Sequence, residues 1–542
     1  MDASVNTRSQ QLRAAMRCYE ASTFDALPIR DLDSTVELTQ GAKPLLRACV
    51  TEVTNHIRTM EGLLRVVDEE CERSRAHSLE RINTFISPTH GLPPEILSRI
   101  FIRCYDKYVS LDCTLQPLLL VCKRWRDVAL STPLLWSSIG VERSHYSTTV
   151  IARRLKLVLG TFLRRSHNVP ISLYLSIRPT LYCSQTLTAI LPHLPRCKLL
   201  ELDGVSVDCN TDFLSRIATD ALSLESFSFS ATYYSIFGHE SIAFVAFQSP
   251  RLRHIAAYDG HTFSLPLPWA QLTHLHLGNE SECRPFTARL FSCFDVLRRC
   301  VELTDFSFYS LDHRPPPGFQ GSAPIVLPKL RFLQMQGSSS DYLLLDRLVA
   351  PKLTNLTYIP MSLPRRYRCY FAPACTFRRC IEQSGCNLQC LTIRPGHASW
   401  NEVIDWLHCV PSLPELRLEF KHTSVHSRKK LFQALSQPST LKKYSGPSVV
   451  PRLRRIHVIL AGLAWDSVPH FQQSLISMIS SRCTNSPTQN SDSSSSTSTG
   501  PTRCLEYVRV GSSRTEDTGD EFRLQIRTHL REFVEAGITL HV

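Results

Sequence analysis

Residues 92–139 read LPPEILSRIFIRCYDKYVSLDCTLQPLLLVCKRWRDVALSTPLLWSSI, and they concentrate large apolar side chains with almost no catalytic chemistry. Pro93 and Pro94, followed by Glu95, predict the start of a helix, because the first helical turn tolerates proline and its positive end favours a carboxylate. The apolar residues that then follow at helical spacing are Ile96, Leu97, Ile100 and Phe101. The stretch is typical of a small helical domain.

Two further apolar segments complete this stretch. The run at residues 118–122 leads into a basic and aromatic cluster at residues 123–126, and residues 133–136 read PLLW. In the order and spacing of its parts the stretch resembles the F-box, which has an opening LPxEIL helix, a VCKRW helix and a terminal PLLW. It departs from the usual F-box pattern at residues 106–114, which lengthen the link between the first two helices.

F-box proteins use this module to bind the Skp-family adaptor of cullin ubiquitin ligases, and the resemblance implies the same adaptor and cullin scaffold as partners here. Large anchors such as Trp125 and Trp136 dominate many interfaces. Both tryptophans have a second interpretation, as core residues of the small domain, and the two roles can coexist. The predicted adaptor contacts are Leu92, Pro93, Ile96, Leu97, Ile100, Phe101, Leu119, Val121, Cys122, Trp125, Leu135 and Trp136.

A helix is predicted ahead of this block, at residues 41–86, after a polar and aperiodic arm at residues 1–40. Its apolar residues step alternately by four and three positions, which indicates a coiled-coil seam over three heptads. The alternative is an amphipathic helix that packs on the chain's own body. The seam consists of Leu46, Val50, Val53, Ile57, Met60, Leu64 and Val67.

An irregular repeat follows a helix predicted near residues 148–165 and a strand near residues 169–177. Each copy has three apolar residues, the second three positions after the first and the third two positions later, and most copies recur at about 20 to 35 residues. The last two residues would point inward from a short strand, and copies would stack because one copy cannot bury its own apolar edge. The pattern resembles a leucine-rich-repeat solenoid. Copies begin at Cys197, Leu224, Leu252, Leu272, Leu303, Leu330, Leu353, Leu388, Leu413, Leu453 and Leu505.

Residues between the inward ones would face the open side of the sheet and offer a surface to a target protein. Aromatic residues and arginines are favoured in interfaces. The alternative is ordinary sheet surface. The predicted target contacts are Tyr258, His274, His276, Tyr309, Phe332, Arg394, Arg417, Arg455, Tyr507 and Arg509.

The charge distribution and the lack of long apolar runs argue against nucleic-acid binding, secretion and membrane insertion. A net charge of +13 suits an acidic partner, but the basic residues are spread along the chain, which argues against nucleic-acid binding. The N-terminal residues lack a secretory signal, and no apolar run is long enough to span a membrane. We therefore expect a protein of the cytosol or nucleus, with free thiols at most of its 20 cysteines.

Motifs for catalysis are absent from the sequence, which has no P-loop, dinucleotide-binding glycine turn, zinc-protease helix or nucleophile elbow. We expect a chain that is not an enzyme and binds no cofactor. His274 and His276 alternate along one strand and favour partner contacts over a ligand pair. Irregular spacing favours buried thiols over a metal site at Cys369, Cys375, Cys380, Cys386 and Cys390.

Together these patterns predict an α+β chain with a small all-α F-box at residues 87–142. An irregular α/β leucine-rich-repeat solenoid with short parallel strands would follow at residues 143–542, with a disordered insertion at residues 484–502. The predicted function is substrate recognition for an SCF-type cullin ubiquitin ligase. The alternatives are an F-box scaffold without a ligase role, and a metal or nucleic-acid binding protein.

Overall fold

The structure is a computed structural model, and it divides into two compact units, Met1–Pro93 and Pro94–Val542. The residues that it describes are 42–86, 89, 91–104, 109–110, 115–141, 149–176, 183–205, 211–231, 247–257, 267–278, 290–309, 323–337, 342–360, 372–394, 400–421, 425–436, 449–461, 468–483, 505–512, 527–535 and 537–541. The predicted arm at residues 1–40, the predicted insertion at residues 484–502 and Tyr258 lie outside them.

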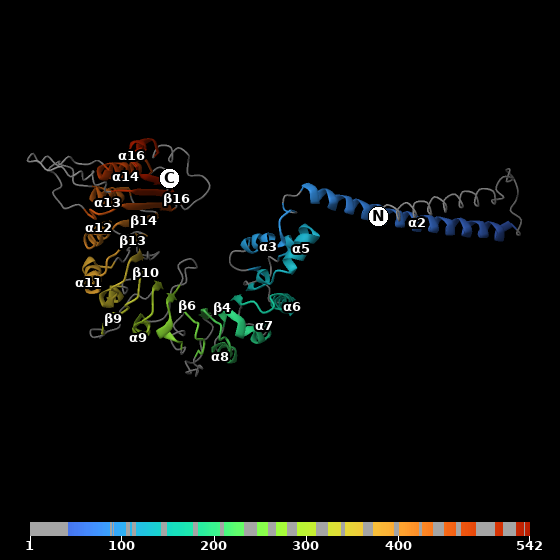
Figure 1. Cartoon of the computed structure of the whole chain (residues 1–542), viewed down its shortest axis with the longest axis horizontal. Helices are drawn as coiled ribbons and strands as arrows, with labels where there is room; N and C mark the ends of the chain where they lie inside the picture. Colours follow the sequence, from blue (N-terminus) through green and yellow to red (C-terminus); the bar gives the residue numbers. More distant parts are fainter. Residues whose placement is uncertain are drawn as a thin grey trace, which may run out of the picture. The chain divides into compact units, whose positions relative to one another are not determined.

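In the residues described for the first unit, one long helix is present, α2 (Ala42–Ile86), drawn in blue in Figure 1. It covers the stretch whose periodicity predicts a helix. The hydroxyls of Thr51, Thr54 and Thr59 donate to backbone carbonyls four residues earlier, so these polar groups find partners within the helix itself.

Short helices begin the second unit: α3 (Pro94–Arg103), α4 (Gln116–Val121), α5 (Lys123–Leu130) and the 3-10 turn η1 (Pro133–Trp136). Cys122 separates α4 from α5 because its backbone is extended, with φ −159° and ψ 169°. Its Sγ accepts the backbone N–H of Trp125 at 3.5 Å and so caps the start of α5.

The segment predicted to be an all-α F-box is not entirely helical, which corrects that expectation. β2 (Ser138–Val141) follows η1 and pairs in parallel with β1 (Val109–Ser110), which lies in the long link between α3 and α4. Ile139 and Val141 are two residues apart and both buried, as the period of a strand requires. Because β2 also pairs with β3 (Ile171–Ser176), the helical part continues directly into the sheet.

A sheet of 15 strands dominates the second unit, and its strands lie in chain order. All pairings among the described strands are parallel, so each step along the sheet needs a crossover connection. A separate pair forms from β9 (Ile325–Val326) and β11 (Leu348–Val349). The remaining strands are β4 (Cys197–Val205), β5 (Ser226–Ala231), β6 (His254–Ala257), β7 (His274–Leu277), β8 (Asp305–Tyr309), β10 (Phe332–Gly337), β12 (Asn355–Pro360), β13 (Cys390–Ile393), β14 (Glu415–Lys421), β15 (Arg455–Ala461), β16 (Tyr507–Ser512) and β17 (Thr539–His541).

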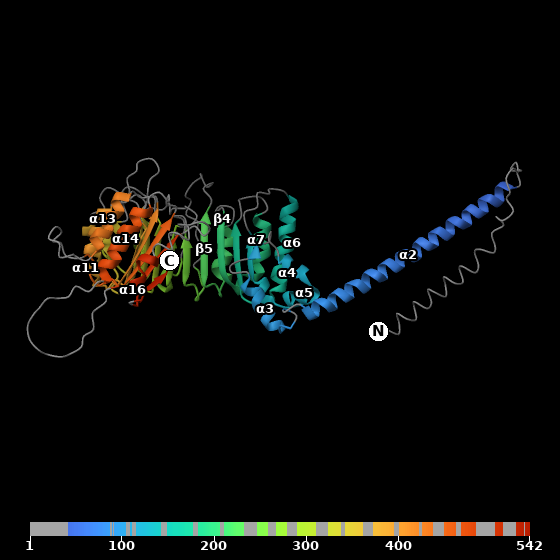
Figure 2. The ribbon, with the colours of Figure 1, turned by 90° about the horizontal axis from the view of Figure 1, so that it is seen from above.

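Helices lie on one side of this curved sheet, its convex side in Figure 1, and Figure 2 shows the strands side by side. Along each strand, every second side chain points toward the helices. The side chains between them therefore face the opposite side of the sheet, which we call the open side. The helices are α6 (Thr149–Arg165), α7 (Cys183–Ile190), α8 (Thr211–Asp220), α9 (Leu290–Arg299), α10 (Tyr342–Arg347), α11 (Ala374–Ser384), α12 (Trp400–His408), α13 (Val425–Leu435), α14 (Val468–Cys483) and α16 (Arg531–Glu535), with the 3-10 turns η2 (Leu191–Arg196) and η4 (Trp269–Gln271).

The apolar positions of the sequence repeat occupy equivalent places in neighbouring strands. Phe227 of β5 pairs with Leu200 of β4 on one side and with Ile255 of β6 on the other. A slip of one residue would turn this row toward the open side, so its burial determines the register. The row continues along the sheet, and its buried members are Leu200, Phe227, Ile255, Leu275, Phe306, Leu333, Leu356, Leu391, Leu416, Ile456 and Val508.

Candidate functional site

Large apolar side chains are exposed on the helices that begin the second unit. Ile96 and Ile100 of α3 lie one helical turn apart and are 41% and 42% exposed. Leu120 and Val121 at the end of α4 are 66% and 58% exposed, and Leu134 of η1 is 54% exposed. Because α5 contacts both α3 and α4, and α3 contacts η1, these five residues come from neighbouring elements. We call them the apolar surface, since several such side chains together indicate an interaction site.

The predicted adaptor contacts differ in their exposure. The exposed ones are Pro93, Ile96, Ile100, Val121 and Cys122. The half-buried ones are Leu92, Leu119 and Trp125. The buried ones are Leu97, Phe101, Leu135 and Trp136.

Burial corrects the prediction for those last four residues, which are at most 3% exposed and form the core of the helical segment. The Trp136 indole donates its Nε1–H to the backbone oxygen of Ala129 at 2.8 Å. Its ring packs edge-on against Phe162, with ring centroids 4.9 Å apart, and the guanidinium of Arg165 lies 4.5 Å from the ring centre. Trp136 therefore joins the short helices to α6 and presents no surface to a partner.

Leu120 and Leu134 are exposed residues that the sequence prediction missed. Each stands directly beside a residue that was chosen, Leu119 or Leu135, in an unbroken apolar run. Periodicity cannot distinguish the members of such a run, because all of them are apolar and only the packing partner decides which side is buried.

The open side of the sheet carries most of the predicted target contacts. His276, Phe332, Arg417, Arg455 and Arg509 are exposed there. The half-buried ones are His274, Arg394 and Tyr507. Tyr309 corrects the prediction, because it is 8% exposed and its hydroxyl accepts a hydrogen bond from the side-chain amide of Gln334 on the neighbouring strand.

A hollow of about 440 Å³ lies on the open side of β14 to β17. Glu415, Arg455, Tyr507 and Thr539 pair in register across the four strands, and Arg417 pairs with His457 two positions further along. The sequence prediction named Arg417, Arg455 and Tyr507 and missed the other lining residues. The lining consists of Glu415, Arg417, Arg455, His457, Glu506, Tyr507 and Thr539.

The carboxylate of Glu415 is the centre of the polar contacts in this hollow. Arg417 donates to it through Nε at 2.7 Å and Nη2 at 2.6 Å. Nε2 of His457 lies 3.4 Å from the same carboxylate, and Nη1 of Arg455 lies 3.9 Å from it. Burial, and then the positive charge of Arg417, lowers the pKa of His457, although Glu415 acts in the opposite direction. The imidazole is therefore neutral near pH 7.

The lining carries two arginines, Arg417 and Arg455, and two glutamates, Glu415 and Glu506, so its formal charges balance. The exposed Arg509, which pairs with His457 on the neighbouring strand, adds one positive charge beside the hollow. A surface of this kind favours acidic groups on a partner.

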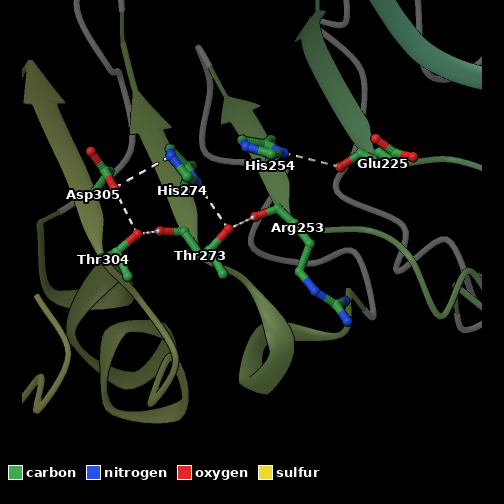
Figure 3. Close-up of polar contacts among 7 residues, drawn as sticks. All are labelled: Glu225, Arg253, His254, Thr273, His274, Thr304 and Asp305. Atoms are coloured by element: carbon green, nitrogen blue, oxygen red, sulfur yellow. Dashed lines mark hydrogen bonds and ion pairs between the residues drawn. The ribbon is translucent and has the colours of Figure 1, made fainter.

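A second polar group crosses β6, β7 and β8 at their first positions (Figure 3). His254 pairs with His274, and His274 pairs with Asp305. The two imidazole centroids lie 4.2 Å apart, and Nε2 of His274 lies 3.3 Å from the Asp305 carboxylate. Thr304 donates its hydroxyl to the same carboxylate at 2.6 Å. Burial and then the neighbouring His254 lower the pKa of His274, against the opposite effect of Asp305.

This arrangement predicts that acidification destabilises the fold. Because the pKa of His274 is lower in the folded state than in the unfolded chain, the unfolded chain binds more protons near pH 6.5. The stability that the neutral ring contributes is present above that pH and is lost as the pH falls toward the folded-state value. Thermal unfolding followed by circular dichroism should give a melting temperature a few degrees lower at pH 5.5 than at pH 7.5. His274→Asn should reduce this difference, and an unchanged pH dependence in that variant would contradict the assignment.

The described residues include no group of three or more His, Cys, Asp or Glu placed to hold a metal ion. Of the five clustered cysteines, Cys380 and Cys390 are buried, Cys386 is half-buried and Cys375 is exposed, while Cys369 lies outside the described residues. Burial raises the pKa of the Cys380 thiol to about 12. In the part of the chain that the structure describes, no helix is long and apolar enough to cross a membrane.

The short helices that carry the apolar surface lie within a stretch of the chain that matches a known protein family. Residues 89–142 match the family model described as F-box-like. The chain thus contains an F-box-like domain, and F-box domains are protein-interaction modules rather than catalytic ones. The match begins just before α3 and ends after β2, so it includes every residue of the apolar surface. A comparison with curated proteins finds no match to the chain.

Proposed function

We propose that this chain is the substrate-recognition subunit of an SCF-type cullin ubiquitin ligase, acting in the cytosol or nucleus. Its F-box-like domain would bind the Skp-family adaptor, and its sheet would bind a target protein. The observation that carries the proposal is the apolar surface within the F-box-like domain. Among the described residues nothing covers the exposed part of these side chains, so a partner that covers it explains their presence.

The adaptor interface would use the outer side of α3, α4 and η1. Full burial of a side chain such as Ile96, Ile100 or Leu120 contributes about 1.5 to 3 kcal/mol. Because these five side chains are already about half covered in the free chain, each contributes about half of that value on binding, and together they offset several kcal/mol of the translational and rotational freedom that association costs. The half-buried Trp125 packs on Phe101 with ring centroids 5.0 Å apart, so its exposed edge would meet the adaptor in a fixed orientation.

We infer that the sheet is an irregular leucine-rich-repeat solenoid. The support is the strand order, which follows the chain, together with the parallel pairing and the single buried row of apolar residues. Each copy contributes one strand, and most contribute a helix or 3-10 turn behind it. A stack of this kind presents a long open face to a partner.

The target would bind this open face, with the hollow at β14 to β17 as one contact. The positive charge that Arg509 adds beside the hollow favours a target segment with acidic side chains. The target's lysines would then be held near the ubiquitin thioester on a conjugating enzyme bound elsewhere on the ligase. Rate acceleration would come from this raised local concentration, so no side chain of the chain itself takes part in bond making.

Charge reversal on the open face tests target binding. The double variant Arg455→Glu and Arg509→Glu should retain the adaptor in affinity capture from cells, but should recover at least about 10-fold less of the target proteins that the wild type captures. The double variant Arg251→Glu and Arg452→Glu is a matched control, because these exposed arginines lie in turns outside the strands. Equal loss of targets in both double variants would contradict a specific role for the hollow.

Removal of the protein tests the ligase role. Proteins captured through the open face should lose ubiquitin conjugates and rise in abundance when the chain is deleted, and only a chain with an intact apolar surface should restore them. If ubiquitination of every captured partner stays unchanged after deletion, the chain is an F-box scaffold without a ligase role.

A further inference from the structure

Helix α2 carries a stripe of exposed apolar side chains over the first two thirds of its length. Val50, Ile57 and Leu64 follow one another at intervals of seven residues and are 63%, 54% and 59% exposed. Val53, Met60 and Val67 form a second series with the same interval, and all three are at least 36% exposed. The two series alternate by three and four residues, so they define positions a and d of three heptads.

We infer that α2 pairs with α2 of a second copy of this chain in a parallel, in-register coiled coil, which makes the protein a homodimer. Val50 and Ile57 at position a are β-branched, which suits two parallel strands when leucine occupies position d. Position d holds Val53, Met60 and Val67 instead, so the charges beside the stripe carry the choice of partner. A stripe that repeats every seven residues faces a copy of itself along its whole length, because both helices then supercoil with the same period.

Charges beside the stripe are complementary in this arrangement. In a parallel pair, position g of one helix lies near position e of the next heptad in the other helix. Glu70 would therefore lie near Arg75 of the second copy, and His56 near Glu61 of the second copy. Both contacts are favourable, and the symmetry of the dimer repeats each of them on the other side.

The stripe ends within the helix. After Cys71, the next positions d and a are Ser74 and Ser78, which are small and polar. The paired part is thus confined to the N-terminal two thirds of α2, and the dimer should dissociate at low protein concentration because three to four heptads give limited stability. A dimer carries two F-box-like domains and two open sheet faces, so a target with two binding segments gains effective concentration. The inference does not depend on the ligase role.

Cys71 makes the direction of pairing measurable. It occupies position a and is an exposed free thiol. In a parallel, in-register pair the two Cys71 residues face each other at a separation that a disulfide accepts, about 4.4–6.8 Å between Cα atoms. Diamide oxidises two such thiols to one disulfide and takes up both electrons and both protons. Treatment of the purified full chain should give a dimer on a non-reducing gel, absent in Cys71→Ser and retained in Cys104→Ser, whose cysteine is also exposed.

Sedimentation velocity over a range of concentrations tests the stripe itself. Leu64→Asp should raise the dimer dissociation constant at least about 100-fold, because it places an unpaired charge at a buried position a. Val66→Asp is the matched control, since Val66 is equally exposed at 58% but lies at position c, away from the seam, and should still dimerise.

Three results would overturn the inference. The first is a wild-type chain that stays monomeric at every concentration. This result is expected if another segment of the same chain, and not a second copy, covers the stripe. The second is equal dissociation by Leu64→Asp and Val66→Asp. The third is a stable dimer whose cross-link persists without Cys71 or never forms through it, which would exclude the parallel register.

Discussion

Replacing Ile100 with aspartate is expected to remove the Skp-family adaptor from the captured chain while the fold is retained. Ile100 is 42% exposed and lies on the outer side of α3, so the new carboxylate stays hydrated in the free chain. In the complex it would be buried against apolar groups, which costs about 3 kcal/mol and weakens binding roughly 100-fold. Binding of the purified adaptor by isothermal titration calorimetry measures the change.

The matched control for this variant is Leu222→Asp. Leu222 is also a large apolar residue, 50% exposed, and it lies outside the F-box-like domain. This variant should bind the adaptor as the wild type does. Full adaptor binding by Ile100→Asp would show that the apolar surface is not the docking site, and would leave the F-box-like match without its expected partner.

Replacing Arg482 with methionine is expected to lower the free energy of unfolding by about 3–5 kcal/mol. Arg482 of α14 is 2% exposed. Its guanidinium donates to the backbone oxygens of Leu435 at 2.5 Å, Val449 at 2.8 Å and Val450 at 3.1 Å. Methionine has a similar length but no donor, so these buried carbonyls would lose that partner. Urea denaturation of the purified chain measures the difference.

The control for Arg482→Met is Gln473→Ala, an exposed position on the same helix, where the loss should be below about 0.5 kcal/mol. Val450, one of the acceptors, has a positive φ of 47°, which is uncommon for a β-branched residue. The bond from Arg482 helps to hold this turn before β15. A loss below 1 kcal/mol in Arg482→Met would contradict that structural role.

Local sequence patterns predicted the helices and strands well where their period was strong. The helix expected near residues 148–165 is α6, the strand near residues 169–177 is β3, and the repeat positions meet in one buried row. These elements were predictable because an apolar residue that returns with a regular period must share one side of a helix or strand. The strand in the F-box-like domain was missed because β2 has only four residues and follows an apolar turn.

The candidate site was predicted less completely. Glu415 was missed, although it pairs with Arg455, because the sequence prediction favoured aromatic and basic residues and gave no weight to a carboxylate at the same place in the repeat. His457 was missed although it pairs with Arg417 on the neighbouring strand. Arg482 was missed entirely, since a lone arginine on an amphipathic helix gives no sign that it is buried.

The order of the residues is enough to show which positions are apolar, with what period they return, and that residues 89–142 resemble an F-box, because these are properties of neighbouring positions along one chain. Folding was needed to show that Leu97 and Trp136 are core while Ile100 and Leu134 are surface, and that Glu415, Arg455 and Tyr507 meet in one hollow. Burial depends on what packs against a side chain, and in this protein the packing partners are separated by tens of residues along the chain and brought together only by the parallel sheet.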